Sequence, residues 1–272
     1  MMTGRRMKWG GVGLTAALLA GVAVFSWLLV PPAGEAQEAG DLTRQVEAAP
    51  DGSVRFSYEA REGVCGDGRH ISLNGDDDGA HEHDDWRCQD GPIWVEIEKS
   101  GSRIMDFDMW VGRTRASRDA PRSDLGSVGA REAADYLLAL ARRIDGDHGD
   151  EAIGAASLAA DVVIWPELLE MARDRSLDTD TREGAVFWLA QLAGDHATEG
   201  LEEIVRSDDD TEVKEAALFG LSQLPDGAGF DALMQVAREG DDPELVQASI
   251  FWLGQTGDPR AISLFEEILA RN

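Results

Sequence analysis

Three segments in the last third of the chain repeat one pattern at a fixed spacing. Each copy carries a phenylalanine, a leucine two positions later and a glutamine four positions later, and the phenylalanines are Phe187, Phe219 and Phe251. The copies therefore recur every 32 residues. A fixed period of about 20–50 residues is typical of repeat proteins, in which a unit buries its apolar face only against its neighbours. This constraint limits the possible folds more than any other feature of the chain.

Each period contains two helical patterns separated by a short break. After the third copy, Gly257 suits the left-handed residue that ends a helix, and Asp258 followed by Pro259 is typical of a helix start. Apolar residues over 262–269 then recur at helical spacing. We therefore expect each unit to read helix, turn, helix, turn, with one leucine of each copy pointing into a common interior: Leu189, Leu221 and Leu253.

This unit resembles the short HEAT repeats first noted in phycobilisome lyases. The segment from Val246 to Leu269, with its run Gly254-Gln-Thr-Gly-Asp-Pro259, carries the resemblance, which covers most of residues 126–272. The resemblance implies a mainly α protein, an α-solenoid of about four helix pairs, and scaffolding rather than lyase activity. Residues 155–158 align with 186–189 and form a degenerate first repeat, expected to pack as a capping unit against the module before it.

Residues 1–36 have the features of a targeting segment. Arg5, Arg6 and Lys8 precede an apolar, uncharged stretch over 9–30, and a small-residue cleavage site follows at 34–36. The stretch fits a cleaved signal peptide and is also long enough for a retained inner-membrane anchor. Both alternatives place the rest of the chain on the exported side, periplasmic or extracellular. Residues 37–50 are small and polar and predict a linker.

Residues 51–115 predict a small β-rich module. Strand patterns occur at 54–58, 92–98 and 104–111, and the last two read as a hairpin. The only two cysteines, Cys65 and Cys88, both lie in this module. In an exported chain they predict a disulfide, which would help so short a module to be stable. A pair of metal-binding thiolates is the alternative, but no CxxC motif is nearby.

The composition and the motifs bear on the class of function. The formal net charge is −27, which opposes binding to nucleic acid or to anionic lipid. The chain contains no GxSxG elbow, Walker loop or dinucleotide-binding glycine pattern. We therefore expect no enzyme and no cofactor. The expected partner is another protein or a peptide, bound on the concave face of the repeat array.

The repeated phenylalanines define the candidate partner-binding face. The residues four positions before and after each phenylalanine lie on the same side of its helix. Stacked repeats would turn them into parallel rows of an apolar ridge flanked by amides and carboxylates. The alternative is that the phenylalanines pack between repeats as ordinary core. The predicted set, called the Phe–Gln face below, is Glu183, Phe187, Gln191, Glu215, Phe219, Gln223, Gln247, Phe251 and Gln255.

An acidic loop at residues 74–85 is the second candidate site. Its oxygen-bearing residues partly follow the spacing of an EF-hand calcium loop: Asn74, Asp76, Asp78, Glu82 and Asp85. His81 stands where that motif packs a hydrophobic residue, and no helix pattern precedes the loop. The alternatives are a solvated acidic loop, or a zinc or copper site that uses His70, His81 and His83. A third function, besides partner binding and metal binding, is a rigid membrane-tethered spacer.

Overall fold

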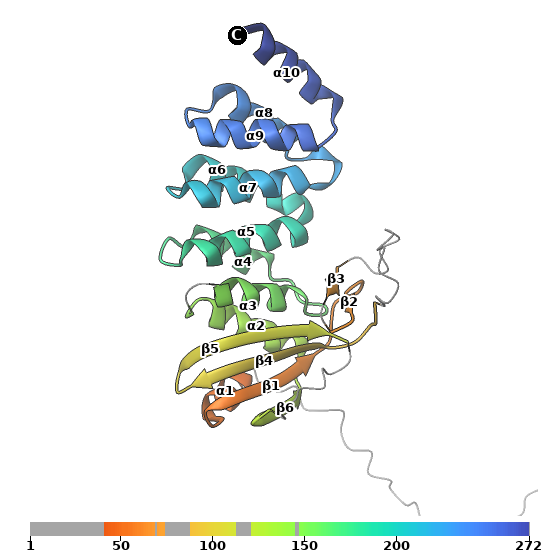
Figure 1. Cartoon of the computed structure of the whole chain (residues 1–272), viewed down its shortest axis with the longest axis vertical. Helices are drawn as coiled ribbons and strands as arrows, with labels where there is room; N and C mark the ends of the chain where they lie inside the picture. The colour runs from red at the N-terminus through yellow and green to blue at the C-terminus, as the bar shows by residue number, and fades with distance from the viewer. Residues whose placement is uncertain (1–40, 69, 74–87, 113–120, 145–146, 272) are drawn as a thin grey trace, which may run out of the picture. The chain divides into compact units, whose positions relative to one another are not determined.

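A computed structural model describes residues 41–68, 70–73, 88–112, 121–144 and 147–271 (Figure 1). The predicted signal or anchor segment at 1–36 and the acidic loop at 74–85 lie outside these ranges. None of the helices in the described ranges is both long enough and apolar enough to cross a membrane.

A four-stranded sheet precedes most of the helices, in the order β5-β4-β1-β6. β1, β4 and β5 are antiparallel neighbours, and β6 runs parallel to β1. Along β4 the buried residues Ile93, Val95 and Ile97 alternate with more exposed ones, so that one face of the sheet is covered. The strands are β1 (Gly52–Tyr58), β4 (Ile93–Ser100), β5 (Arg103–Val111) and β6 (Ser123–Ser127).

The three predicted strands are confirmed, but the sheet extends beyond the predicted module at 51–115. Its fourth strand, β6, lies in a stretch that reads as a polar connector. The sequence Ser-Asp-Leu-Gly-Ser has no alternating apolar pattern, because β6 pairs at the sheet edge with most of its residues exposed. β6 is held by pairing with β1 and by the ion pair between Asp124 and Arg55 at 2.8 Å, and such tertiary contacts leave little trace in the local sequence pattern.

The predicted linker at 37–50 contains a short helix, α1 (Asp41–Ala48). Leu42 and Val46 lie one turn apart and are buried. The buried Lys99 of β4 donates from Nζ to the carbonyl oxygens of Val46, Glu47 and Ala49, at 2.7, 3.1 and 2.8 Å. A cation at a helix C-terminus satisfies carbonyls that have no partner within the helix. The linker prediction is therefore wrong for 41–48, because these tertiary contacts stabilise a helix too short to form alone.

The sheet and the helices share one hydrophobic core, which runs without a break from Leu42 to Leu264. The Tyr58 hydroxyl of β1 donates to the carbonyl oxygen of Ala155 at 2.7 Å, and Phe56 meets Tyr136 edge to face at 5.9 Å between ring centroids. The described residues from 41 onward accordingly form one compact unit. The module at 51–115 is therefore part of this unit and not a separately packed domain.

The helices after the sheet pack in pairs and in a row (Figure 1). Each of α3, α5 and α7 contacts the next odd-numbered helix, and the pairs are α2 with α3, α4 with α5, α6 with α7, and α8 with α9. Short 3-10 turns, η1 (Gly194–His196) and η2 (Pro225–Gly227), follow α5 and α7. The helices are α2 (Ala130–Ala141), α3 (Asp147–Ser157), α4 (Trp165–Arg173), α5 (Thr179–Leu192), α6 (Ala197–Ser207), α7 (Thr211–Gln223), α8 (Phe230–Glu239), α9 (Pro243–Gln255) and α10 (Pro259–Arg271).

The 32-residue register predicts equivalent positions correctly. Leu189, Leu221 and Leu253 are 0%, 1% and 0% exposed, so the expected common interior is confirmed. An aspartate caps each of α5, α7 and α9 at the same spacing, and its carboxylate accepts a backbone N–H of the first turn at 2.9–3.0 Å. These capping residues are Asp178, Asp210 and Asp242.

The degenerate first repeat packs against the sheet, as the sequence predicts. Helix α3 contacts β5, and a Cβ placed on Gly154 of α3 would lie 3.6 Å from Cε of Met109. The small residues of α3 therefore allow the edge strand to approach the first helix of the row.

Candidate functional site

The predicted Phe–Gln face lies on one side of α5, α7 and α9, and most of it is exposed. Phe187 is 36% exposed and Phe251 is 54% exposed, whereas Phe219 is half-buried. The three glutamines that follow the phenylalanines are exposed, as are Glu215 and Gln247, and Glu183 is half-buried. Because the glutamine amides face solvent, they need no buried partners.

The aromatic side chains of this face form a continuous row, although not in the predicted register. Phe187 stacks on Phe219 with ring centroids 6.3 Å apart and planes 6° from parallel. The next contact of Phe219 is Trp252, at 4.8 Å, and Trp252 in turn meets Phe251 edge to face at 4.8 Å. The aromatic row is therefore Phe187, Phe219, Trp252 and Phe251.

The three phenylalanines differ in their packing. Phe219 packs between the rings of neighbouring repeats, as core residues do, while Phe187 and Phe251 present exposed rings. Trp252 was missed as a face residue. A tryptophan follows the phenylalanine in the first and third copies, at 188 and 252, while glycine stands there in the second. A Cβ on that glycine, Gly220, would lie 3.2 Å from Cβ of Ala190 and 3.3 Å from Cδ1 of Leu201, so the glycine allows α7 to approach α5 and α6. The tryptophan shared by the first and third copies was the available signal.

A hollow of 720 Å³ opens at the end of the aromatic row nearest the sheet. Strand β5 contributes Met109, and α3, α5 and α7 contribute the rest of the lining. Its lining is acidic and aromatic. Four carboxylates and two of the phenylalanines contribute to it: Asp150, Glu151, Asp180, Glu183, Phe187 and Phe219.

Two glycines bring α3 and α5 close together beside this hollow. A Cβ on Gly149 would overlap the hydroxyl of Thr181, and a Cβ on Gly184 would overlap the carboxylate of Asp150. This close approach places Asp150 of α3 among the carboxylates of α5. Only Glu183 of these carboxylates belongs to the predicted face, because nothing in the local pattern marks the others.

Among the carboxylates of the hollow, Glu183 has a raised pKa. Partial burial raises the pKa of Glu183 above its ordinary value, and the negative charges of Glu212, Asp180, Asp210 and Asp150 raise that pKa further. No arginine or lysine is among the described residues that line the hollow. The site therefore combines exposed aromatic rings with a negative potential.

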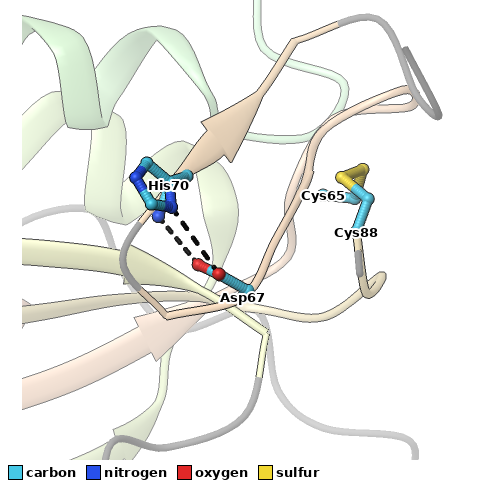
Figure 2. The surroundings of a disulfide bond; sticks show 4 residues. All are labelled: Cys65, Asp67, His70 and Cys88. Carbon is cyan, nitrogen blue, oxygen red and sulfur yellow. Dashed lines mark hydrogen bonds and ion pairs between the residues drawn. A yellow bond between two sulfur atoms is a disulfide. The ribbon is translucent and has the colours of Figure 1, made fainter. Parts of the chain in front are cut away.

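The predicted disulfide is present: Cys65 and Cys88 are bonded, with their Cα atoms 5.2 Å apart (Figure 2). Cys65 begins the short strand β2 (Cys65–Gly66), which pairs with β3 (Ile71–Ser72). Between these strands the backbone N–H of His70 donates to the carboxylate of Asp67 at 2.9 Å.

The proposed calcium ligands Asn74, Asp76, Asp78, Glu82 and Asp85 lie outside the described residues, as do His81 and His83. Within the described ranges, no three His, Cys, Asp or Glu side chains are grouped to hold a metal ion.

We expect the disulfide to stabilise the fold by about 3 kcal/mol, because it closes a loop between residues 23 apart in the sequence. The Cys65→Ala/Cys88→Ala variant should unfold at lower urea concentration than the wild type, as followed by tryptophan fluorescence. A reducing agent should lower the wild-type midpoint to that of the variant and leave the variant unchanged. A wild-type midpoint that does not respond to reduction would contradict the prediction.

The comparison with known protein families bears on the helical part of the chain. Residues 198–272 match the family model of HEAT repeats. The match begins in α6 and runs to the last residue, so it includes the second and third copies of the 32-residue pattern. HEAT repeats commonly mediate protein–protein interaction. No curated protein and no solved structure matches the chain.

Proposed function

We propose that the protein is a non-catalytic protein-interaction scaffold that binds a partner on the Phe–Gln face. The observation that carries the proposal is the aromatic row, whose two outer phenylalanines are 36% and 54% exposed. Aromatic side chains are enriched at the centres of protein interfaces, and exposed apolar clusters mark interaction sites. The match to HEAT repeats supports the same function.

In this proposal the helix pairs form an α-solenoid of about four short repeats of the phycobilisome-lyase kind. The contacts of α3 with α5, α5 with α7 and α7 with α9 support it, as does the fixed 32-residue register. The Phe–Gln face would then be the concave side, where successive repeats present equivalent side chains.

The proposal places the scaffold outside the cytoplasm. A disulfide between the chain's only cysteines is typical of oxidising compartments. The basic residues and apolar stretch within 1–36 fit export, with the segment either cleaved or retained as an inner-membrane anchor.

Removing two rings of the aromatic row tests the proposed function. The Phe219→Ala/Phe251→Ala variant should recover its partner from an envelope extract of the source organism at least tenfold less efficiently than the wild type, because interface aromatics often contribute about 2 kcal/mol or more. Recovery is measured by quantitative mass spectrometry after crosslinking in cells.

Val163→Ala is the matched control, since this residue is 63% exposed and lies outside the Phe–Gln face. It should leave recovery unchanged. If the double variant recovered as much partner as the wild type and kept its helical circular dichroism spectrum, the proposed function would be wrong.

A further inference from the structure

The hollow beside Phe187 differs from the rest of the Phe–Gln face in its charge. Asp180 and Glu183 of α5 and Asp150 of α3 line it together. The fourth carboxylate, Glu151, contacts His148 Nδ1 at 2.9 Å. Farther along the face, the flanking residues are mostly uncharged glutamines. Glu215 of α7 is the exception, so a partner that covers the whole face meets most of the negative charge at the end beside Phe187.

The aromatic rings at the same place are held by their neighbours. Phe187 stacks on Phe219 and meets Trp188 edge to face at 5.3 Å, and Trp188 is only 8% exposed. A side chain that is already ordered loses little freedom when a partner binds. The exposed part of the Phe187 ring can therefore bind an apolar group, or a cation above the ring, with little loss of side-chain freedom.

We propose that this hollow receives a lysine or arginine side chain from a basic, amphipathic segment of the partner protein. The cationic group would lie between Asp180 and Glu183, and apolar side chains of the same segment would cover Phe187 and Phe219. Charge complementarity selects this occupant, since an acidic segment would add like charges to the carboxylates already present. The inference rests on the proposed function, because it names the chemistry of the partner bound there.

The environment of Glu183 supports a cationic occupant. Burial and four nearby carboxylates already raise the pKa of this group, so its ionised form is disfavoured in the free protein. A positive charge placed between the carboxylates would offset that repulsion. The complex should therefore weaken as the pH falls through the raised pKa, because protonation of Glu183 removes one of the charges that bind the cation.

Two synthetic peptides provide the test. One is a fluorescein-labelled amphipathic peptide of lysine, leucine and phenylalanine, and the other has glutamate in place of every lysine. Fluorescence anisotropy with the full chain should show binding of the lysine peptide only. The Asp180→Asn/Glu183→Gln variant should bind it about tenfold more weakly than the wild type.

A second variant separates local recognition from the attraction of a protein with net charge −27. Glu199→Gln/Glu266→Gln removes the same charge from two exposed carboxylates on α6 and α10. It should bind the lysine peptide as the wild type does. Equal weakening of both variants, equal binding of both peptides, or no binding of the lysine peptide by the wild type would each overturn the inference.

The two proposals fail in different ways. If Phe219→Ala/Phe251→Ala loses its partner from the extract while Asp180→Asn/Glu183→Gln retains it, the scaffold function stands and the cationic occupant is wrong. If neither variant loses the partner, both proposals are wrong.

Discussion

Replacing Arg182 with alanine is expected to lower the free energy of unfolding by about 3–5 kcal/mol. Arg182 is 3% exposed and lies in the first turns of α5. Its guanidinium donates from Nε and Nη2 to the carbonyl oxygen of Ala172 in α4, at 3.1 and 3.0 Å, and pairs with the buried carboxylate of Asp208. One side chain therefore ties α4 and α5 to the segment between α6 and α7.

The expected loss of stability comes mainly from the Asp208 carboxylate, which is left without its partner. The Asp208 carboxylate is 8% exposed in the wild type, and its Oδ1 accepts the backbone N–H of Asp210 at 2.9 Å. Removing Arg182 would take away the guanidinium that pairs with this carboxylate. An uncompensated buried charge is far costlier than a lost surface pair. Urea unfolding followed by circular dichroism measures the difference.

Arg175→Ala is the matched control for this variant. Arg175 Nη1 pairs with Asp209 Oδ2 at 2.7 Å, but the two side chains are 55% and 79% exposed. An exposed ion pair contributes less than about 1 kcal/mol. If both variants lost the same small amount of stability, the buried pair would not link neighbouring helix pairs as described.

Leu221→Ala is expected to destabilise the protein by about 2–5 kcal/mol, because it leaves a cavity at the centre of the helix row. Leu221 is 1% exposed on α7, and this helix contacts both α5 and α9. Neighbouring side chains that are already packed on both sides can close such a cavity only in part. Urea unfolding again gives the difference.

The control is Ile262→Ala, which removes the same number of carbon atoms from a side chain that is 59% exposed on α10. It should change stability by less than about 1 kcal/mol. A Leu221→Ala variant as stable as the Ile262→Ala variant would contradict the common interior that the repeat predicts.

Features that depend on period or on local chemistry could be predicted from the sequence. The 32-residue register located α5, α7 and α9 and the buried leucines, because a helix at a fixed spacing presents the same face in every copy. Asp258 and Pro259 predicted the start of α10, because an aspartate before a proline is a typical helix start. The disulfide followed from the presence of only two cysteines in the chain.

Other features depend on which distant residues meet. Helix α1 forms because Lys99 donates to the carbonyl oxygen of Val46 near its end and because its apolar residues pack into the core. Strand β6 forms because it pairs with the free edge of β1. On the Phe–Gln face, the order of the aromatic row was decided by Trp252, which comes between Phe219 and Phe251.

The exposed phenylalanines and glutamines of the candidate site were determined by the sequence alone, since helical spacing places them on one side of each helix. Only the tertiary structure decided that β5, α3, α5 and α7 together line an acidic hollow at one end of that face. The physical reason is that helical periodicity determines which way a side chain points from its own helix. The neighbours it meets depend on how close the helices approach, and here two glycines set that distance.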